Sequence, residues 1–101
     1  MRVNTQHILD RSPGVDYEYD LYEFETSGLK YLARSYTSEP GEAHFLRKEV
    51  GGQTAPLTTH DVQSALFRDA VAYLRGLGKS RVRYLSSEAA SYVVLHPEPA
   101  A

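Results

Sequence analysis

Three acidic residues alternate early in the chain, and carboxylates are ligands that hard metal ions prefer. Asp16, Glu18 and Asp20 would share one face of a β-strand, and calcium and magnesium bind oxygen atoms. Alternate residues of a strand are about 6.8 Å apart, so one ion would need further ligands from elsewhere. The chain also lacks a loop with the calcium-binding spacing. We therefore favour a solvated or ion-paired strand face, and we predict no metal site and no cofactor.

The histidines offer general-base chemistry but have no suitably spaced partners. His60 lies at the start of a predicted helix, where the helix dipole lowers its affinity for a proton. Paired with Asp61 or a tyrosine hydroxyl, it could act as a general base. We favour an exposed first-turn residue, because no second catalytic group is in view. The absence of cysteine excludes disulfides, thiolate metal sites and cysteine nucleophiles. We predict no catalytic residue and favour a protein that is not an enzyme.

A basic stretch follows the predicted helix, and basic groups can bind phosphate. It contains Arg75, Lys79, Arg81 and Arg83 and no acid. With nearby tyrosines for stacking, this pattern would suit weak nucleic-acid binding. The net charge of −2 argues against a general nucleic-acid binder, and basic residues also protect the edges of sheets. Nucleic acid therefore stays an alternative hypothesis.

A long amphipathic helix is predicted over residues 58–77. Val62, Leu66 and Leu74 are among apolar residues that recur at steps of three and four. Thr58 and Asp61 have the spacing of a capping box, and glycines follow the last turn. Such a helix cannot bury its apolar stripe alone, so a sheet must pack against it.

Alternating apolar and polar residues predict the strands of that sheet. They span residues 17–25, 29–37, 42–50 and 80–85. Residues 86–90 are predicted to form a loop or a short helical turn, and the β-prone residues 92–95 are the candidate for a fifth strand. The predicted fold class is α+β in the order β-β-β-α-β-β, in which an antiparallel meander of three strands packs one face against the helix. Residues 1–101 form one domain, with an irregular lead-in at 1–15 and a frayed tail at 96–101.

The pairing of these strands is predicted from turns and charge. A three-residue hairpin loop at 26–28 would place Asp20 opposite Arg34 and Tyr22 opposite Leu32. The crossover through the helix makes the fourth strand parallel to its neighbour. We place it beside the first strand, because Arg81 and Arg83 would then face acidic residues there.

This arrangement predicts an apolar patch on the face of the sheet that points away from the helix. Five large apolar residues form it: Tyr22, Phe24, Leu32, Tyr36 and Phe45. Such a group is typical of a surface that binds a protein partner or a second copy of the chain. Two alternatives stay open. The 92–95 segment or Ile8 and Leu9 could cover the patch, or the hairpin register could be off by one, which would move every residue to the other face.

A second hypothesis is a small-ligand site or minor enzyme pocket between helix and sheet. It would be lined by tyrosines whose hydroxyls need partners: Tyr19, Tyr31, Tyr73 and Tyr84. Water and backbone carbonyls would serve equally well. The leading hypothesis therefore remains a non-enzymatic interaction domain, self-associating or docking through the outer patch.

The sequence predicts neither a membrane-spanning stretch nor a signal peptide. No apolar run approaches the roughly 18 residues that a span needs. The N-terminal residues lack the apolar core of a signal sequence. We expect a cytoplasmic protein without membrane contact, and secretion by a route without a signal peptide stays open.

Overall fold

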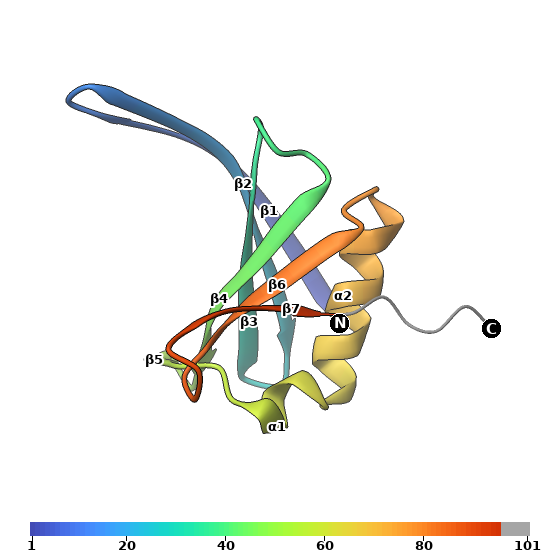
Figure 1. The fold of residues 1–101 in the computed structure, drawn as a ribbon. Coiled ribbons are helices and arrows are strands. Elements are labelled where there is room, and N and C mark those ends of the chain that lie inside the picture. The colour runs from blue at the N-terminus through green and yellow to red at the C-terminus, as the bar shows by residue number, and fades with distance from the viewer. Residues whose placement is uncertain (96–101) are drawn as a thin grey trace.

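The computed structural model describes residues 1–95, which form a mixed α/β domain made mostly of one sheet (Figure 1). The elements in chain order are β1 (Arg2–Ser12), β2 (Val15–Thr26), β3 (Leu29–Tyr36), β4 (Glu42–Val50), β5 (Gln53–Ala55), α1 (Thr59–Val62), α2 (Ala65–Gly76), β6 (Arg81–Ser86) and β7 (Ser91–Leu95). The sheet order is β1-β2-β3-β4-β6-β7, and β5 pairs with β4 alone. No helix in this part of the chain is long and apolar enough to cross a membrane.

The N-terminal segment is a strand, so the predicted irregular lead-in at 1–15 is wrong. β1 pairs with β2 over its full length, and Pro13 and Gly14 form the turn between Ser12 and Val15. Gly14 has φ +84°, which suits glycine in a tight turn. Most of β1 is exposed on both faces. Its sequence therefore lacks the alternation of apolar and polar residues that predicts a strand. The tip of the hairpin projects beyond the rest of the sheet (Figure 1).

The β2–β3 hairpin differs from the predicted one by a single residue. Ser27 (φ +49°) and Gly28 (φ +81°) form a two-residue turn, so Thr26 pairs with Leu29. Tyr22 therefore lies opposite Ala33 instead of Leu32. Because side chains alternate between faces, this shift moves every residue of β2 to the face opposite the predicted one.

The core lies between the sheet and the helices, and it contains most of the predicted outer patch. Tyr22, Phe24 and Phe45 are 5%, 0% and 0% exposed and pack with residues of α2. Their predicted position on the outer face is therefore wrong. In β2 the cause is the turn. In β4 the cause is the β3–β4 connection over residues 37–41, because a two-residue loop at Pro40 and Gly41 was expected to place Phe45 opposite Tyr36, whereas Phe45 pairs with Ala33. Leu32 and Tyr36 do alternate away from the core residues Tyr31 and Ala33, as predicted.

The predicted long helix is two shorter ones. Thr58 caps α1, and the capping box with Asp61 is confirmed. The helix stops at Gln63, and Ser64 begins α2 by accepting a hydrogen bond from the Phe67 amide at 3.2 Å. Ser64 adopts an extended backbone (ψ 152°) and so changes the direction of the chain between the helices.

The strands after the helices pair at the opposite edge from the one predicted. β6 is parallel to β4, which confirms the parallel crossover but not the neighbour. Glu42, at the start of β4, accepts a hydrogen bond from Arg83 at 2.8 Å and contacts Arg81 at 3.3 Å. It therefore forms the ion pairs that were predicted for acids of β2. The fifth strand forms as β7, antiparallel to β6. The predicted tail at 96–101 lies outside the described residues.

A buried polar group fixes α1 to the sheet. Asp61 is 5% exposed and accepts hydrogen bonds from Lys48 Nζ at 2.8 and 3.0 Å and from the Tyr31 hydroxyl at 3.0 Å. The Thr58 amide also donates to it at 2.9 Å, and Tyr31 contacts Ser64 at 3.2 Å. We call these five residues the Asp61 network. Burial opposes ionisation of Asp61, but these hydrogen bonds outweigh it and hold the pKa of the carboxyl below its usual value.

Candidate functional site

The face of the sheet opposite the helices, here called the outer face, is not covered by any helix among residues 1–95 (Figure 1). Helices α1 and α2 both pack on the other face, where the core residues lie. The outer face carries side chains from five neighbouring strands, and several of its apolar groups remain solvent-exposed. The most exposed are Tyr17, Leu85, Tyr92 and Val94.

Rings contact one another across this face from β2 to β7. Tyr36 packs edge-on against Tyr19, with ring centroids 5.8 Å apart, and against His44 at 6.2 Å. His44 in turn contacts Tyr92 at 5.4 Å. Arg34 lies opposite His44 in the β3–β4 pair. We call Tyr19, Arg34, Tyr36, His44 and Tyr92 the cation–aromatic row.

Arg34 carries a positive charge that no carboxylate of the described chain balances. Its guanidinium carbon lies 4.7 Å from the centroid of the Tyr36 ring and 5.6 Å from that of Tyr19. Its buried Nε has no hydrogen-bond partner within residues 1–95. The two rings therefore hold the cation by cation–π contact alone.

His44 is buried in the row and presents an unused ring nitrogen. The residue is 8% exposed, and its Nδ1 has no hydrogen-bond partner in the described part of the chain. Burial lowers the pKa of His44, and the neighbouring Arg83 and Arg34 charges lower it further. The imidazole is therefore neutral near pH 7, with its Nδ1 unsatisfied in the middle of a polar surface.

Two further cations flank the row on β6, where the acids are Glu42 and the neighbouring Glu39. Arg83 lies directly opposite His44, and both Arg83 and Arg81 contact Glu42. The Nε of Arg83 is buried and has no partner among the described residues. This part of the outer face therefore has more positive than negative charge, although the chain as a whole is slightly acidic.

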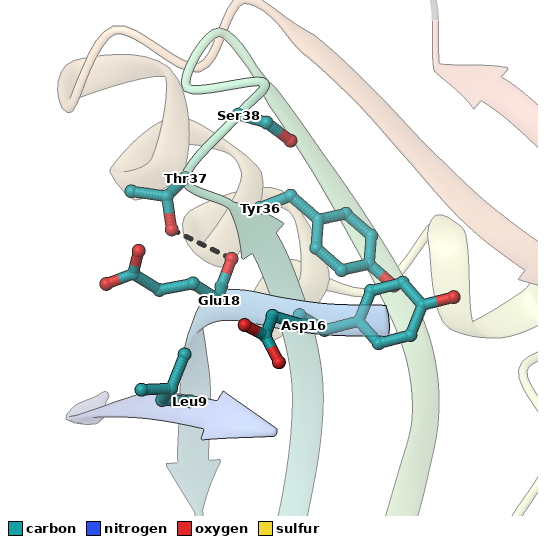
Figure 2. Close-up of a pocket in the computed structure, with 7 residues that line it drawn as sticks. Leu9, Asp16, Glu18, Tyr36, Thr37 and Ser38 are labelled. Carbon is teal, nitrogen blue, oxygen red and sulfur yellow. Dashed lines mark hydrogen bonds between the residues drawn. The ribbon is translucent and has the colours of Figure 1, made fainter. Parts of the chain in front are cut away.

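A pocket of about 350 Å³ opens at one end of the row (Figure 2). It is lined by Leu9, Asp16, Tyr17, Glu18, Tyr36, Thr37 and Ser38. β2 continues past the end of β3 here, and the Thr37 hydroxyl ties the two by donating to the Glu18 carbonyl at 2.8 Å. Tyr17 and Tyr36 both line the pocket, and their ring centroids lie 6.0 Å apart, so the pocket connects to the row through Tyr36.

Two of the three alternating acids of β2 are paired with a histidine that the sequence did not single out. His7 of β1 contacts Asp20 at 2.7 Å and Glu18 at 2.8 Å. The hydrogen bonds to Asp20 and Glu18 raise the pKa of His7. This agrees with the favoured interpretation of an ion-paired strand face. No cluster able to hold a metal ion occurs among residues 1–95.

The structure does not bring the predicted basic residues together. Arg81 and Arg83 lie on the outer face, whereas Arg75 belongs to α2 on the other side of the sheet. Lys79 is 9% exposed, and its ammonium group donates to the Pro40 carbonyl at 3.0 Å. The nucleic-acid hypothesis therefore loses the continuous basic surface on which it depended.

The predicted tyrosine-lined pocket is also divided between the two faces. Tyr31 and Tyr84 are buried beneath the helices, whereas Tyr19 lies on the outer face and Tyr73 is 38% exposed on α2. The Tyr31 hydroxyl already contacts Asp61 and Ser64. The grouping was wrong because the hairpin shift moved Tyr19. A base role for His60 has no support either, since the Asp61 carboxylate is engaged by the Asp61 network.

No family model, curated protein or solved structure matches this chain. The geometry of the outer face is therefore the evidence for function. Sequence reasoning missed Arg34 and His44 as candidate residues. The available signal was their position, because Arg34 alternates with Tyr36 on one strand and His44 lies in the next.

Proposed function

We propose that the protein is a non-enzymatic interaction domain that binds a partner protein across the outer face. The observation that carries the proposal is Arg34, an unpaired cation held between two tyrosine rings in the centre of an uncovered sheet. A cation left without a counter-ion costs free energy that a partner's carboxylate would recover. Tyr36, a member of the predicted interface, belongs to the same surface, whereas Leu32 points to this face but is only 3% exposed.

The composition of the cation–aromatic row supports a protein partner. Tyrosine and arginine are enriched at the residues that contribute most to protein–protein binding, because they combine large apolar area with a polar end. Tyr92 is 41% exposed and Val94 37% exposed at one end of the surface, so apolar area is available for burial. Ring contacts hold Tyr36 and His44 in place, so binding would order few additional side chains.

Charge defines the kind of partner. Arg34 has no counter-ion, and Arg81 and Arg83 share the carboxylate of Glu42. A partner segment with an acidic residue facing Arg34 and apolar residues facing Tyr36 and Tyr92 would complement both features. The pocket beside Tyr36 would receive a side chain from the same segment, and its acidic residue Asp16 favours a basic or hydroxyl-bearing group there.

The test compares two substitutions of the same chemistry on opposite faces. Arg34→Glu reverses the unpaired charge of the row, and Arg68→Glu makes the same change at an exposed position of α2. Affinity capture from the native host should recover a protein with the wild type and with Arg68→Glu, and lose it with Arg34→Glu. Tyr36→Ser should reduce the captured amount by about tenfold or more, because truncated interface tyrosines commonly cost over 1 kcal/mol.

Two controls make the result decisive. Circular dichroism and thermal melting must show that each variant is folded. The captured protein, once purified, should bind the wild type directly and with an affinity that falls as salt rises, since a charged contact is screened. Equal recovery by all variants would contradict a binding role for the outer face.

A further inference from the structure

β1 is a long edge strand whose second side is unpaired among residues 1–95. It runs for 11 residues, pairs with β2 on one side, and has no described strand on the other. Its backbone groups on that side are therefore available for pairing with another strand. The opposite edge of the sheet, β7, has only 5 residues.

β1 also lacks most of the features that usually protect such an edge, and its charged residues Arg2, Asp10 and Arg11 lie only near its two ends. It contains neither lysine nor proline, and its register with β2 is continuous from Arg2 to Ser12 without a bulge. Natural sheets commonly block exposed edges with those devices because an open edge pairs with other chains. Their absence over the longest free edge of this sheet indicates an edge that is used.

One backbone hydrogen bond beyond the end of β3 shows which residues of β1 point their backbone groups outward. The Thr37 amide donates to the Glu18 carbonyl at 3.0 Å, so the backbone groups of Glu18 point toward β3. Its partner on β1, Leu9, is then in a pair without mutual hydrogen bonds, and its own groups point to the free edge. By alternation, the same holds for Val3, Thr5 and His7.

We propose that two copies of the chain pair through antiparallel β1 strands, with Gln6 facing Gln6 of the partner subunit on a two-fold axis. In this register Arg2 faces Asp10 of the partner subunit, and Val3 faces Leu9 of the partner subunit. Both contacts occur twice by symmetry. Leu9 is 50% exposed, and the Arg2 side chain is exposed with a 3.8 Å contact to Glu25 of its own chain, so both can reach a second copy. The outward backbone groups of the two strands meet directly.

Neighbouring registers lack this complementarity. Paired residues must point to the same face, so the two residue numbers in each pair must add up to an even number. Moving the centre to His7 leaves Arg2 opposite a serine and brings two histidines together, each in a site that raises its pKa. Moving it to Thr5 sets Arg2 against Ile8. Only the register centred on Gln6 pairs opposite charges and apolar side chains at once.

The inference does not depend on the proposed function, because β1 contributes no residue to the cation–aromatic row. The two surfaces share only Leu9, which also lines the pocket beside Tyr36. Sedimentation equilibrium of the full chain should show a species of twice the 11.3 kDa chain mass. Asp10→Lys would place two lysine–arginine contacts across the axis and should weaken the dimer by about tenfold or more. Arg2→Asp combined with Asp10→Lys exchanges the charges and should restore most of the lost affinity.

A matched control and an amide readout complete the test. Arg11→Glu changes the charge of the same strand at a position that faces no charged side chain in this register, so the dimer should keep its affinity. Hydrogen exchange at the amides of Thr5, His7 and Leu9 should slow as protein concentration rises. A monomer at all concentrations, or a dimer that Asp10→Lys leaves unchanged, would overturn the proposal.

Discussion

The two faces of the sheet each hold a polar cluster, and the clusters differ in how completely their hydrogen bonds are satisfied. Under the helices, the Asp61 carboxylate accepts from Lys48, Tyr31 and Thr58. On the outer face, Arg34 and His44 each keep a buried nitrogen without a partner in the described chain. Polar groups that are satisfied internally stabilise a fold, whereas unsatisfied ones at a surface indicate a missing partner.

The difference follows from what covers each face. Helices α1 and α2 remove the Asp61 network from water, so an incomplete set of bonds there would destabilise the fold directly. The cation–aromatic row lies on a face without such a cover, where water or a partner can reach its edges. The same sheet can therefore be rigid on one side and still have binding capacity on the other.

The largest expected effect is the loss of the Asp61 carboxylate. Asp61→Ala removes the α1 capping box and leaves Lys48 and Tyr31 without their acceptor. We expect the free energy of unfolding to fall by about 3 kcal/mol, as for a broken buried ion pair. Urea unfolding followed by circular dichroism measures this change. A loss below about 1 kcal/mol would show that the network contributes little to stability.

A matched pair of substitutions tests the comparison itself. Lys48→Met and Arg34→Met each replace a long cation by an apolar chain of similar length, on opposite faces. The first leaves Asp61 without its cation and should destabilise by about 2 kcal/mol. The second removes an unpaired cation and should change stability by less than about 1 kcal/mol. Similar losses in chemical denaturation would erase the distinction between the faces.

Acid should weaken the helix-side cluster. The pKa of Asp61 is held below its usual value, because hydrogen bonds from Lys48 and Thr58 outweigh the effect of burial. Its contribution to stability is therefore complete above the unfolded pKa, about 4, and is lost as pH falls through the lower folded value. Wild type should lose stability over that range more steeply than Asp61→Asn, and parallel pH profiles would contradict this assignment.

The smallest effects concern the histidines and have opposite signs. Hydrogen bonds to Asp20 and Glu18 raise the pKa of His7, so its contribution is present at low pH and is lost as pH rises through the folded pKa. Burial lowers the pKa of His44, so its contribution is present above about 6.5 and declines as pH falls toward the folded value. NMR titration should place the His7 and His44 midpoints on opposite sides of an unperturbed histidine. Coincident midpoints would remove the contrast.

The sequence predicted best where the signal was local. The capping box of Thr58 and Asp61, the strands over 29–37 and 42–50 and the parallel crossover are all present. β1 was missed, because a strand exposed on both faces has no apolar alternation. The candidate interface failed for a different reason. A single residue in the β2–β3 turn exchanged the two faces of β2 and placed Tyr22 and Phe24 in the core.

By itself, the sequence determined most of the strands and the helical segment of a mostly sheet domain, though not β1, β5 or the break between the helices, because propensity and apolar spacing act over a few neighbouring residues. The tertiary structure alone decided which side chains share a face. Register depends on turn geometry and on packing between distant strands, and its period of two makes an error of one residue reverse the assignment. Arg34, Tyr36 and His44 became a candidate site only when β3 and β4 were paired in three dimensions.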